Sequence, residues 1–175
     1  AGYCYEWVSK AEPNAFDIQL EDGFNAQWNF ADTSTWAIDA DSFNQVGCIH
    51  TSQGLEFDYV GVIIGRDLVY QSNQVLTDAR KRARTDHSLR GIINDHNATD
   101  VIIRNTYKTL LTRGQKGCYI YCEDKPLAEY IRLQLQQMMA KEHVQQIDIL
   151  TTHERIVDDV DENNKYISFY PVYSI

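Results

Sequence analysis

The stretch of sequence that decides the fold is residues 47–65, which read GCIHTSQGLEFDYVGVIIG. Its second part, residues 59–65, is an apolar, β-branched run that is polar on neither face. Such a run is typical of a central strand in a parallel sheet. Residues 46–49 predict a second, shorter buried strand just upstream. Between these two strands, the polar residues 50–54 predict a turn that contains a glycine.

Strands and helices alternate through the rest of the chain. Residues 116–122 predict another strand. Residues 100–112 carry apolar side chains at helical spacing, with Asn97 or Thr99 as the expected cap. Residues 127–140 predict a second helix with one apolar face. Strands separated by helices favour an α/β fold with a mainly parallel sheet.

The length of 175 residues suits a single domain that spans residues 1–175. Residues 1–45 are irregular and hold all three tryptophans, so we expect them to form a segment that covers the core. In the tail, residues 140–175, an acidic run precedes residues 166–170, which predict an edge strand.

The composition restricts the class of protein. With 16 basic against 25 acidic residues, the net charge is −9, so any contact with nucleic acid must come from a local patch or a partner domain. No apolar run is long enough to cross a membrane, and the start does not resemble a signal peptide. The four cysteines are expected to be reduced core residues, which favours the cytoplasm. The chain does not begin with methionine, as expected for a piece of a longer protein or a processed one.

Residues 50–58, HTSQGLEFD, are the strongest candidate for a functional site. Turns at the carboxyl ends of parallel strands line the ligand crevice of such sheets. Gly54 permits a tight backbone, and the Glu56 carboxylate can accept hydrogen bonds from sugar hydroxyls. The alternative interpretation is an ordinary loop between two strands.

A second candidate is the end of the helix expected over residues 100–112, where Thr112-Arg113-Gly114 leads directly into a strand. A planar guanidinium presented on such a turn suits bidentate binding of a phosphate. The alternative is an arginine that only stabilises the carboxyl end of its helix through the helix dipole.

Taken together, these two segments resemble motifs V and VI of superfamily-one helicases. More narrowly, residues 47–65, 105–122 and 1–4 resemble the uncharacterised family of Schlafen-like, helicase-related P-loop ATPases, and the resemblance covers most of residues 1–135. It implies a RecA-like three-layer fold with a mainly parallel central sheet flanked by helices. It also implies that the chain is the second lobe of a two-lobed NTPase, with the preceding RecA-like lobe of the same protein as its partner.

The resemblance assigns roles to residues. Arg113 would be the arginine finger that reaches the γ-phosphate of ATP, and Glu56 would contact the ribose. Gly54 would let the backbone approach, while Thr51 and Gln53 would lie near the nucleotide or a DNA or RNA strand. Many superfamily-one motors have lysine where this chain has Gln53, and that difference puts strand translocation in doubt.

The sequence has no G-x-x-x-x-G-K-[ST] phosphate loop, so we expect no ATPase activity from this chain alone. ATP with Mg²⁺ is expected in the full-length protein, and no tightly bound cofactor in this chain. The histidines lack H-x-x-x-H spacing, and no metal site is expected.

Possible nucleic-acid contacts are His50 and the basic residues Arg80, Lys81, Arg82 and Arg84. The alternative for this basic cluster is a solvated surface. A different class of function also stays open, in which the domain is a non-enzymatic scaffold or regulatory module.

Overall fold

The strands of the computed structural model, which describes residues 1–29, 35–147 and 167–169, form two small sheets and a hairpin. The first sheet has the order β1-β2-β3, and its strands are β1 (Ile18–Gln19), β2 (Asn25–Trp28) and β3 (Gln45–Val46). The second has the order β4-β7-β8, and its strands are β4 (Phe57–Ile64), β7 (Gly114–Cys122) and β8 (Ile167–Phe169). The hairpin pairs β5 (Leu68–Gln71) with β6 (Gln74–Thr77).

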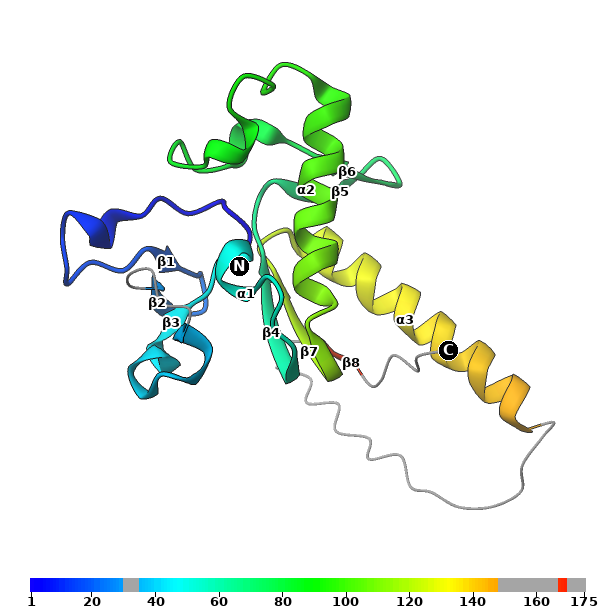
Figure 1. The fold of residues 1–175 in the computed structure, drawn as a ribbon. Helices are drawn as coiled ribbons and strands as arrows, with labels where there is room; N and C mark the ends of the chain where they lie inside the picture. The colour runs from blue at the N-terminus through cyan, green and yellow to red at the C-terminus, as the bar shows by residue number, and fades with distance from the viewer. Residues whose placement is uncertain (30–34, 148–166, 170–175) are drawn as a thin grey trace.

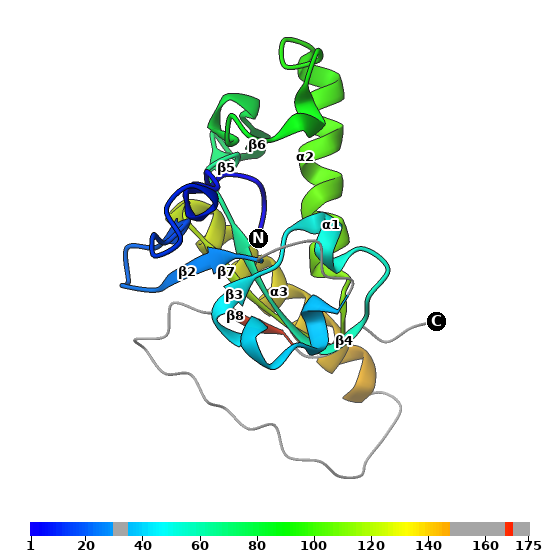
Figure 2. The ribbon, with the colours of Figure 1, turned by 60° about the vertical axis from the view of Figure 1, so that its left-hand side comes forward.

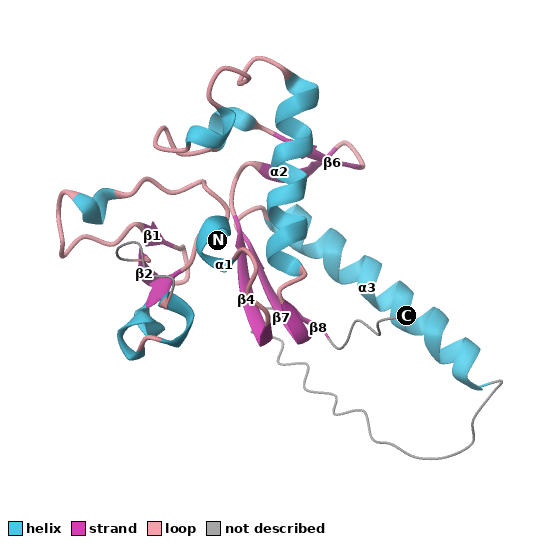
Figure 3. Ribbon diagram, viewed as in Figure 1, coloured by secondary structure: helices cyan, strands magenta, loops and turns pink. Residues whose placement is uncertain are grey.

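Three α-helices and five short 3-10 helices connect these strands. The α-helices are α1 (Ile49–Ser52), α2 (His96–Leu111) and α3 (Lys125–Ile147). The 3-10 helices are η1 (Val8–Lys10), η2 (Trp36–Ile38), η3 (Ala40–Asn44), η4 (Ala79–Lys81) and η5 (His87–Leu89). Figure 3 shows that loops make up much of the N-terminal segment and of the connection between β6 and α2. None of the described helices is long and apolar enough to cross a membrane.

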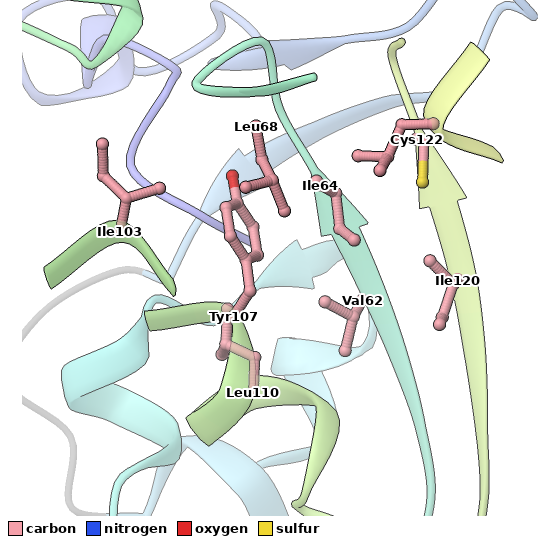
Figure 4. Packing of buried hydrophobic residues seen from close by; sticks show 9 residues of the cluster. Val62, Ile64, Leu68, Ile103, Tyr107, Leu110, Ile120 and Cys122 are labelled. Carbon is pink, nitrogen blue, oxygen red and sulfur yellow. The ribbon is translucent and has the colours of Figure 1, made fainter. Parts of the chain in front are cut away.

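The core of the second sheet is the parallel pair β4 and β7. Their register runs from Tyr59 opposite Gly117 to Ile64 opposite Cys122. On one face, alternate residues of both strands pack against Ile103, Tyr107 and Leu110 of α2 (Figure 4). Leu127 of α3 joins the same cluster. The predicted α/β class with parallel pairing is therefore confirmed.

The opposite face of the β4–β7 pair meets the N-terminal segment. Ile63 and Tyr121 pack against a buried cluster centred on Trp28 and Ile18. The ring of Trp7 lies 6.3 Å from that of Trp28, so these two tryptophans act as the sequence suggested and fix the segment to the core.

Several expectations about local structure need correction. The strand expected over residues 46–49 ends at Val46, because Cys48 is the N-cap of helix α1 and its carbonyl accepts the Ser52 N–H at 3.1 Å. Residues 49–52 are thus helical rather than part of a turn. In the described sheet β4 is an outer strand, not a central one.

Helix α2 begins earlier than the apolar pattern indicates. Its cap is Asp95, whose carboxylate accepts the N–H groups of Asn97 and Ala98 at 3.1 and 3.0 Å. The prediction of Asn97 or Thr99 as the cap was therefore wrong. A carboxylate in this position satisfies backbone donors that have no partner within the helix.

The carboxyl-terminal elements agree with the sequence. Helix α3 contains the predicted residues 127–140 and extends further at both ends. Strand β8 pairs antiparallel with β7, with Phe169 opposite Cys118, so the edge strand expected over residues 166–170 is confirmed over Ile167–Phe169. All four cysteines are free. Cys48 and Cys122 are buried, as expected of core residues, whereas Cys4 and Cys118 are half-buried.

A buried polar cluster links β4, the segment after it and α2. The Tyr107 hydroxyl donates to the Asp67 carboxylate and accepts the Gly65 N–H at 3.0 Å. The carboxylates of Asp67 and Asp86 flank the buried guanidinium of Arg82, with Arg82 Nε 2.8 Å from Asp86 Oδ2. The Tyr107 hydroxyl therefore joins α2 to residues 65–67, which lie 40 to 42 positions earlier in the sequence.

We expect Tyr107→Phe to lower the free energy of unfolding by about 1–3 kcal/mol, because it leaves the Gly65 N–H and an Asp67 oxygen buried without their partner. Tyr59→Phe is the matched control, since that side chain is 53% exposed. Urea denaturation of both variants measures the difference. Equal stability of the two variants would contradict the structural role of the hydroxyl.

Candidate functional site

The two segments singled out by the sequence meet at the amino ends of β4 and β7. The Phe57 N–H donates to the carbonyl of Arg113 at 2.8 Å, and Phe57 lies opposite Gly114 in the strand register. Each segment runs directly into its strand, and the two strands are parallel, so both segments come to the same edge of the sheet (Figure 1). Residues 50–56 lie between the end of β3 and the amino end of β4.

Arg113 follows the last turn of α2 and is half-buried. Its Nε donates to the Thr109 carbonyl at 3.1 Å and its Nη1 to the Leu55 carbonyl at 3.3 Å. These bonds use two of the five guanidinium N–H groups, and Arg113 makes no ion pair within the described residues. The side chain thus connects the end of α2 to the loop before β4 and keeps donors for another acceptor.

Glu56 is exposed beside this arginine turn. Its Oε2 accepts a hydrogen bond from Gln115 Nε2 at 2.5 Å. Sequence reasoning did not single out Gln115. The signal was available in principle, because pairing Phe57 with Gly114 puts the residues next to them on neighbouring strands close together.

The loop between α1 and β4 holds the remaining nucleotide candidates. Gly54 has a φ of +80°, a conformation that favours glycine, and no atom lies within 4 Å of where its Cβ would be. Gln53 is exposed next to it, whereas Thr51 Oγ1 lies 3.2 Å from the thiol of Cys48. Burial would raise the pKa of the Cys48 thiol, but hydrogen bonds to Thr51 and Tyr3 outweigh it and the pKa is lowered.

His50 lies on α1, exposed to solvent, with its ring 6.0 Å from that of Tyr3. It therefore faces the N-terminal segment as well as solvent. Within the described part of the chain, no three His, Cys, Asp or Glu side chains are grouped so that they could hold a metal ion.

A groove of about 380 Å³ begins at Arg113 and follows β4. Its lining is mainly apolar and includes Phe57 and every residue from Tyr59 to Ile63. Consecutive residues of a strand point to opposite faces, so a groove lined by all of them runs along the edge of the strand.

The basic cluster does not act as one surface. Arg80, Lys81 and Arg84 are exposed, and Arg80 pairs with Asp78 at 3.0 Å. The side chain of Arg82 is only 2% exposed and lies between two carboxylates, so this residue is removed from the nucleic-acid candidates. Burial in ion pairs is a structural role that the charge pattern alone does not distinguish from a surface role.

The exposed basic residues lie far from Arg113. They precede α2 and sit near its amino end, whereas Arg113 follows its carboxyl end (Figure 1). At 1.5 Å per residue, the 16-residue helix separates the two regions by roughly 24 Å. The structure therefore brings residues 55–57 and Arg113 together and leaves the basic cluster apart.

This geometry, two loop segments joined at one edge of a parallel sheet, defines a class of α/β domain that presents polar loops at the amino ends of its strands. Comparison with known families gives the match: Schlafen group 3, DNA/RNA helicase domain, over residues 1–124. The chain belongs to this helicase-related family. The match ends just after β7, so α3 and β8 lie beyond it.

A relative in Saccharomyces cerevisiae, described as "Uncharacterized protein YPL245W", is 31% identical over 134 residues. The aligned region covers 71% of this chain and 29% of that protein, so the chain spans less than a third of the relative's length. No solved structure matches the chain.

We expect Gly54→Ala to lower the free energy of unfolding by about 1 kcal/mol, because a Cβ is strained at this positive φ although the space around it is open. Gly61→Ala is the matched control. Its surroundings are equally open, and its φ lies outside the left-handed region. Chemical denaturation of both variants tests this, and an equal loss at the two positions would contradict it.

Proposed function

We propose that this chain is the second RecA-like lobe of a helicase-related ATPase and supplies an arginine finger to an ATP site between two lobes. The observation that carries the proposal is the Phe57–Arg113 backbone bond, which joins the segments resembling motifs V and VI at one sheet edge. Membership of a DNA/RNA helicase domain family supports the same function.

In this proposal Arg113 stabilises the charge that develops on the γ-phosphate during hydrolysis. Its Nε and Nη1 bonds go to neutral carbonyls, which leave the charge of the guanidinium uncompensated. An anionic phosphate is a much stronger acceptor than a carbonyl, so binding can exchange the Leu55 contact for the phosphate. A finger of this kind raises the rate of related phosphoryl transfers by about 10³–10⁵.

Glu56 is the proposed partner of the ribose, because its exposed carboxylate accepts hydrogen bonds and lies at the same edge as Arg113. Its present donor is the amide of Gln115, which a ribose hydroxyl would replace. Gly54 leaves open space above the loop for the nucleotide, with Gln53 and Thr51 beside it. The preceding lobe would hold the phosphates and Mg²⁺, since this sequence has no phosphate loop.

DNA or RNA is a proposed partner of the whole protein. The net charge of −9 and Gln53 argue against strong binding by this lobe alone. Arg80, Lys81 and Arg84 are the exposed basic residues that remain as candidate contacts, together with His50.

A scaffold or regulatory module is the second candidate function. The observation that favours it is that both key side chains already have partners inside the domain, Arg113 with two carbonyls and Glu56 with Gln115. The two functions differ in one consequence, because only an ATPase loses turnover when the arginine is removed.

We expect Arg113→Ala, made in the full-length protein, to lower kcat for ATP hydrolysis by about 10³-fold or more, with a smaller effect on KM. Arg113→Lys keeps the charge but not the bidentate geometry, so it should restore little activity. Arg104→Ala is the matched control, an arginine on the same helix that pairs with Asp100 on the surface. Unchanged turnover in Arg113→Ala would rule out the finger and favour the scaffold.

A further inference from the structure

Two edge strands face the same groove. Strand β3 ends one sheet and β4 ends the other (Figure 2). The groove along β4 is also lined by Gln45, Val46 and Gly47. The groove also has apolar lining from both faces of the β4–β7 pair. Leu110 of α2 belongs to the cluster on one face, and Leu20 of the N-terminal segment belongs to the cluster on the other.

The first residues of the chain lie at one end of this groove. The Gly2 N–H donates to the Ile63 carbonyl at 3.2 Å, and the amino group of Ala1 donates to the Gly47 carbonyl at 2.8 Å. Ala1 thus bridges the β3 side and the β4 side. Further on, Cys4 packs against Gly65, so residues 1–4 run in the same direction as β4.

The backbone of β4 offers hydrogen-bonding groups to the groove in a regular pattern. The Ile64 carbonyl points toward β7 and accepts the Glu123 N–H at 3.0 Å, whereas the Ile63 carbonyl points toward Gly2. Backbone groups of successive strand residues alternate in direction. The peptide groups of Tyr59 and Gly61 therefore face the groove together with those of Ile63.

We propose that a segment of polypeptide joined directly to Ala1 lies in this groove as a parallel β-strand between β3 and β4 and unites the two sheets. The Gly2–Ile63 bond sets its register, with Ala1 opposite Ile63 and the preceding residues opposite β4 in turn. A strand of about six residues reaches from Ile63 to Phe57. Both of its faces meet apolar walls, so the segment is rich in aliphatic, β-branched residues.

Two physical arguments favour this occupant over solvent. An open strand edge in an apolar groove leaves backbone donors and acceptors without partners and promotes aggregation. The nitrogen of Ala1 points toward the β3 side and donates to the Gly47 carbonyl at 2.8 Å, while the next N–H, that of Gly2, points toward β4. This alternation is that of a strand lying between β3 and β4.

The proposal shares one premise with the proposed function, namely polypeptide that precedes Ala1. It does not depend on ATP hydrolysis. Loss of turnover in Arg113→Ala leaves the strand assignment untouched, and the experiments below detect the strand whether or not the protein is an ATPase.

Residue-resolved amide hydrogen exchange by NMR tests the strand directly. In a protein that carries the residues before Ala1, we expect the amides of Tyr59, Gly61 and Ile63 to exchange at least about 100-fold more slowly than unprotected amides. The amides of Val60, Val62 and Ile64 are the internal control, because they face β7. Fast exchange at the three groove-facing amides beside slow exchange at the control amides would overturn the proposal.

Gly61→Pro provides a second test in the same protein. Proline removes the N–H that faces the groove, and an open edge tolerates this whereas a paired strand does not. We expect Gly61→Pro to lower the melting temperature well below that of Gly61→Ala, which keeps the N–H in open surroundings, and to speed exchange at Tyr59 and Ile63. Equal melting temperatures with unchanged exchange would show that no strand pairs with this edge.

Discussion

The parallel pairing of β4 with β7 is the interaction on which the rest of the domain depends. One face of the pair carries the apolar core with α2 and α3, and the other fixes the N-terminal segment through Ile63 and Tyr121. The same pairing places residue 57 opposite residue 114, so two loops far apart in sequence share one edge. Without this register, Arg113 and Glu56 would belong to unrelated parts of the surface.

Much of this organisation could be read from the sequence, because it depends on long apolar patterns. The run of residues 59–65 and the helical spacing of residues 100–112 identify a strand and a helix whose burial outweighs local preference. The short elements were harder to predict from the sequence. Helix α1 is four residues long, and its formation depends on the Cys48 carbonyl and the Ser52 side chain rather than on any periodicity.

The candidate site, too, could be predicted from the sequence only in part. The residue types of Arg113 and Glu56 suggested phosphate and sugar chemistry, but their partners, Thr109, Leu55 and Gln115, follow from strand register and helix termination. Arg82 illustrates the opposite case. Arg80, Lys81 and Arg84 near it are exposed, yet the side chain of Arg82 is buried. It lies between Asp67, which the fold brings close, and Asp86, which is four residues further along the chain. Charge patterns predict where cations occur along the chain and not which of them reach solvent.

Helix α2 has a mechanical consequence. Asp100 in its second turn accepts a hydrogen bond from Thr77 at 2.8 Å, and Arg104 in its middle donates to the Val75 carbonyl at 2.7 Å, so the β5–β6 hairpin is attached to this part of the helix. Beyond its other end, Arg113 is held by the last turn through Thr109. At 1.5 Å per residue, the nine to thirteen residues that separate Arg104 and Asp100 from Arg113 span roughly 14–20 Å of this helix. A displacement of the hairpin would therefore reach the guanidinium through the backbone of one helix, without any chain of side-chain contacts between them.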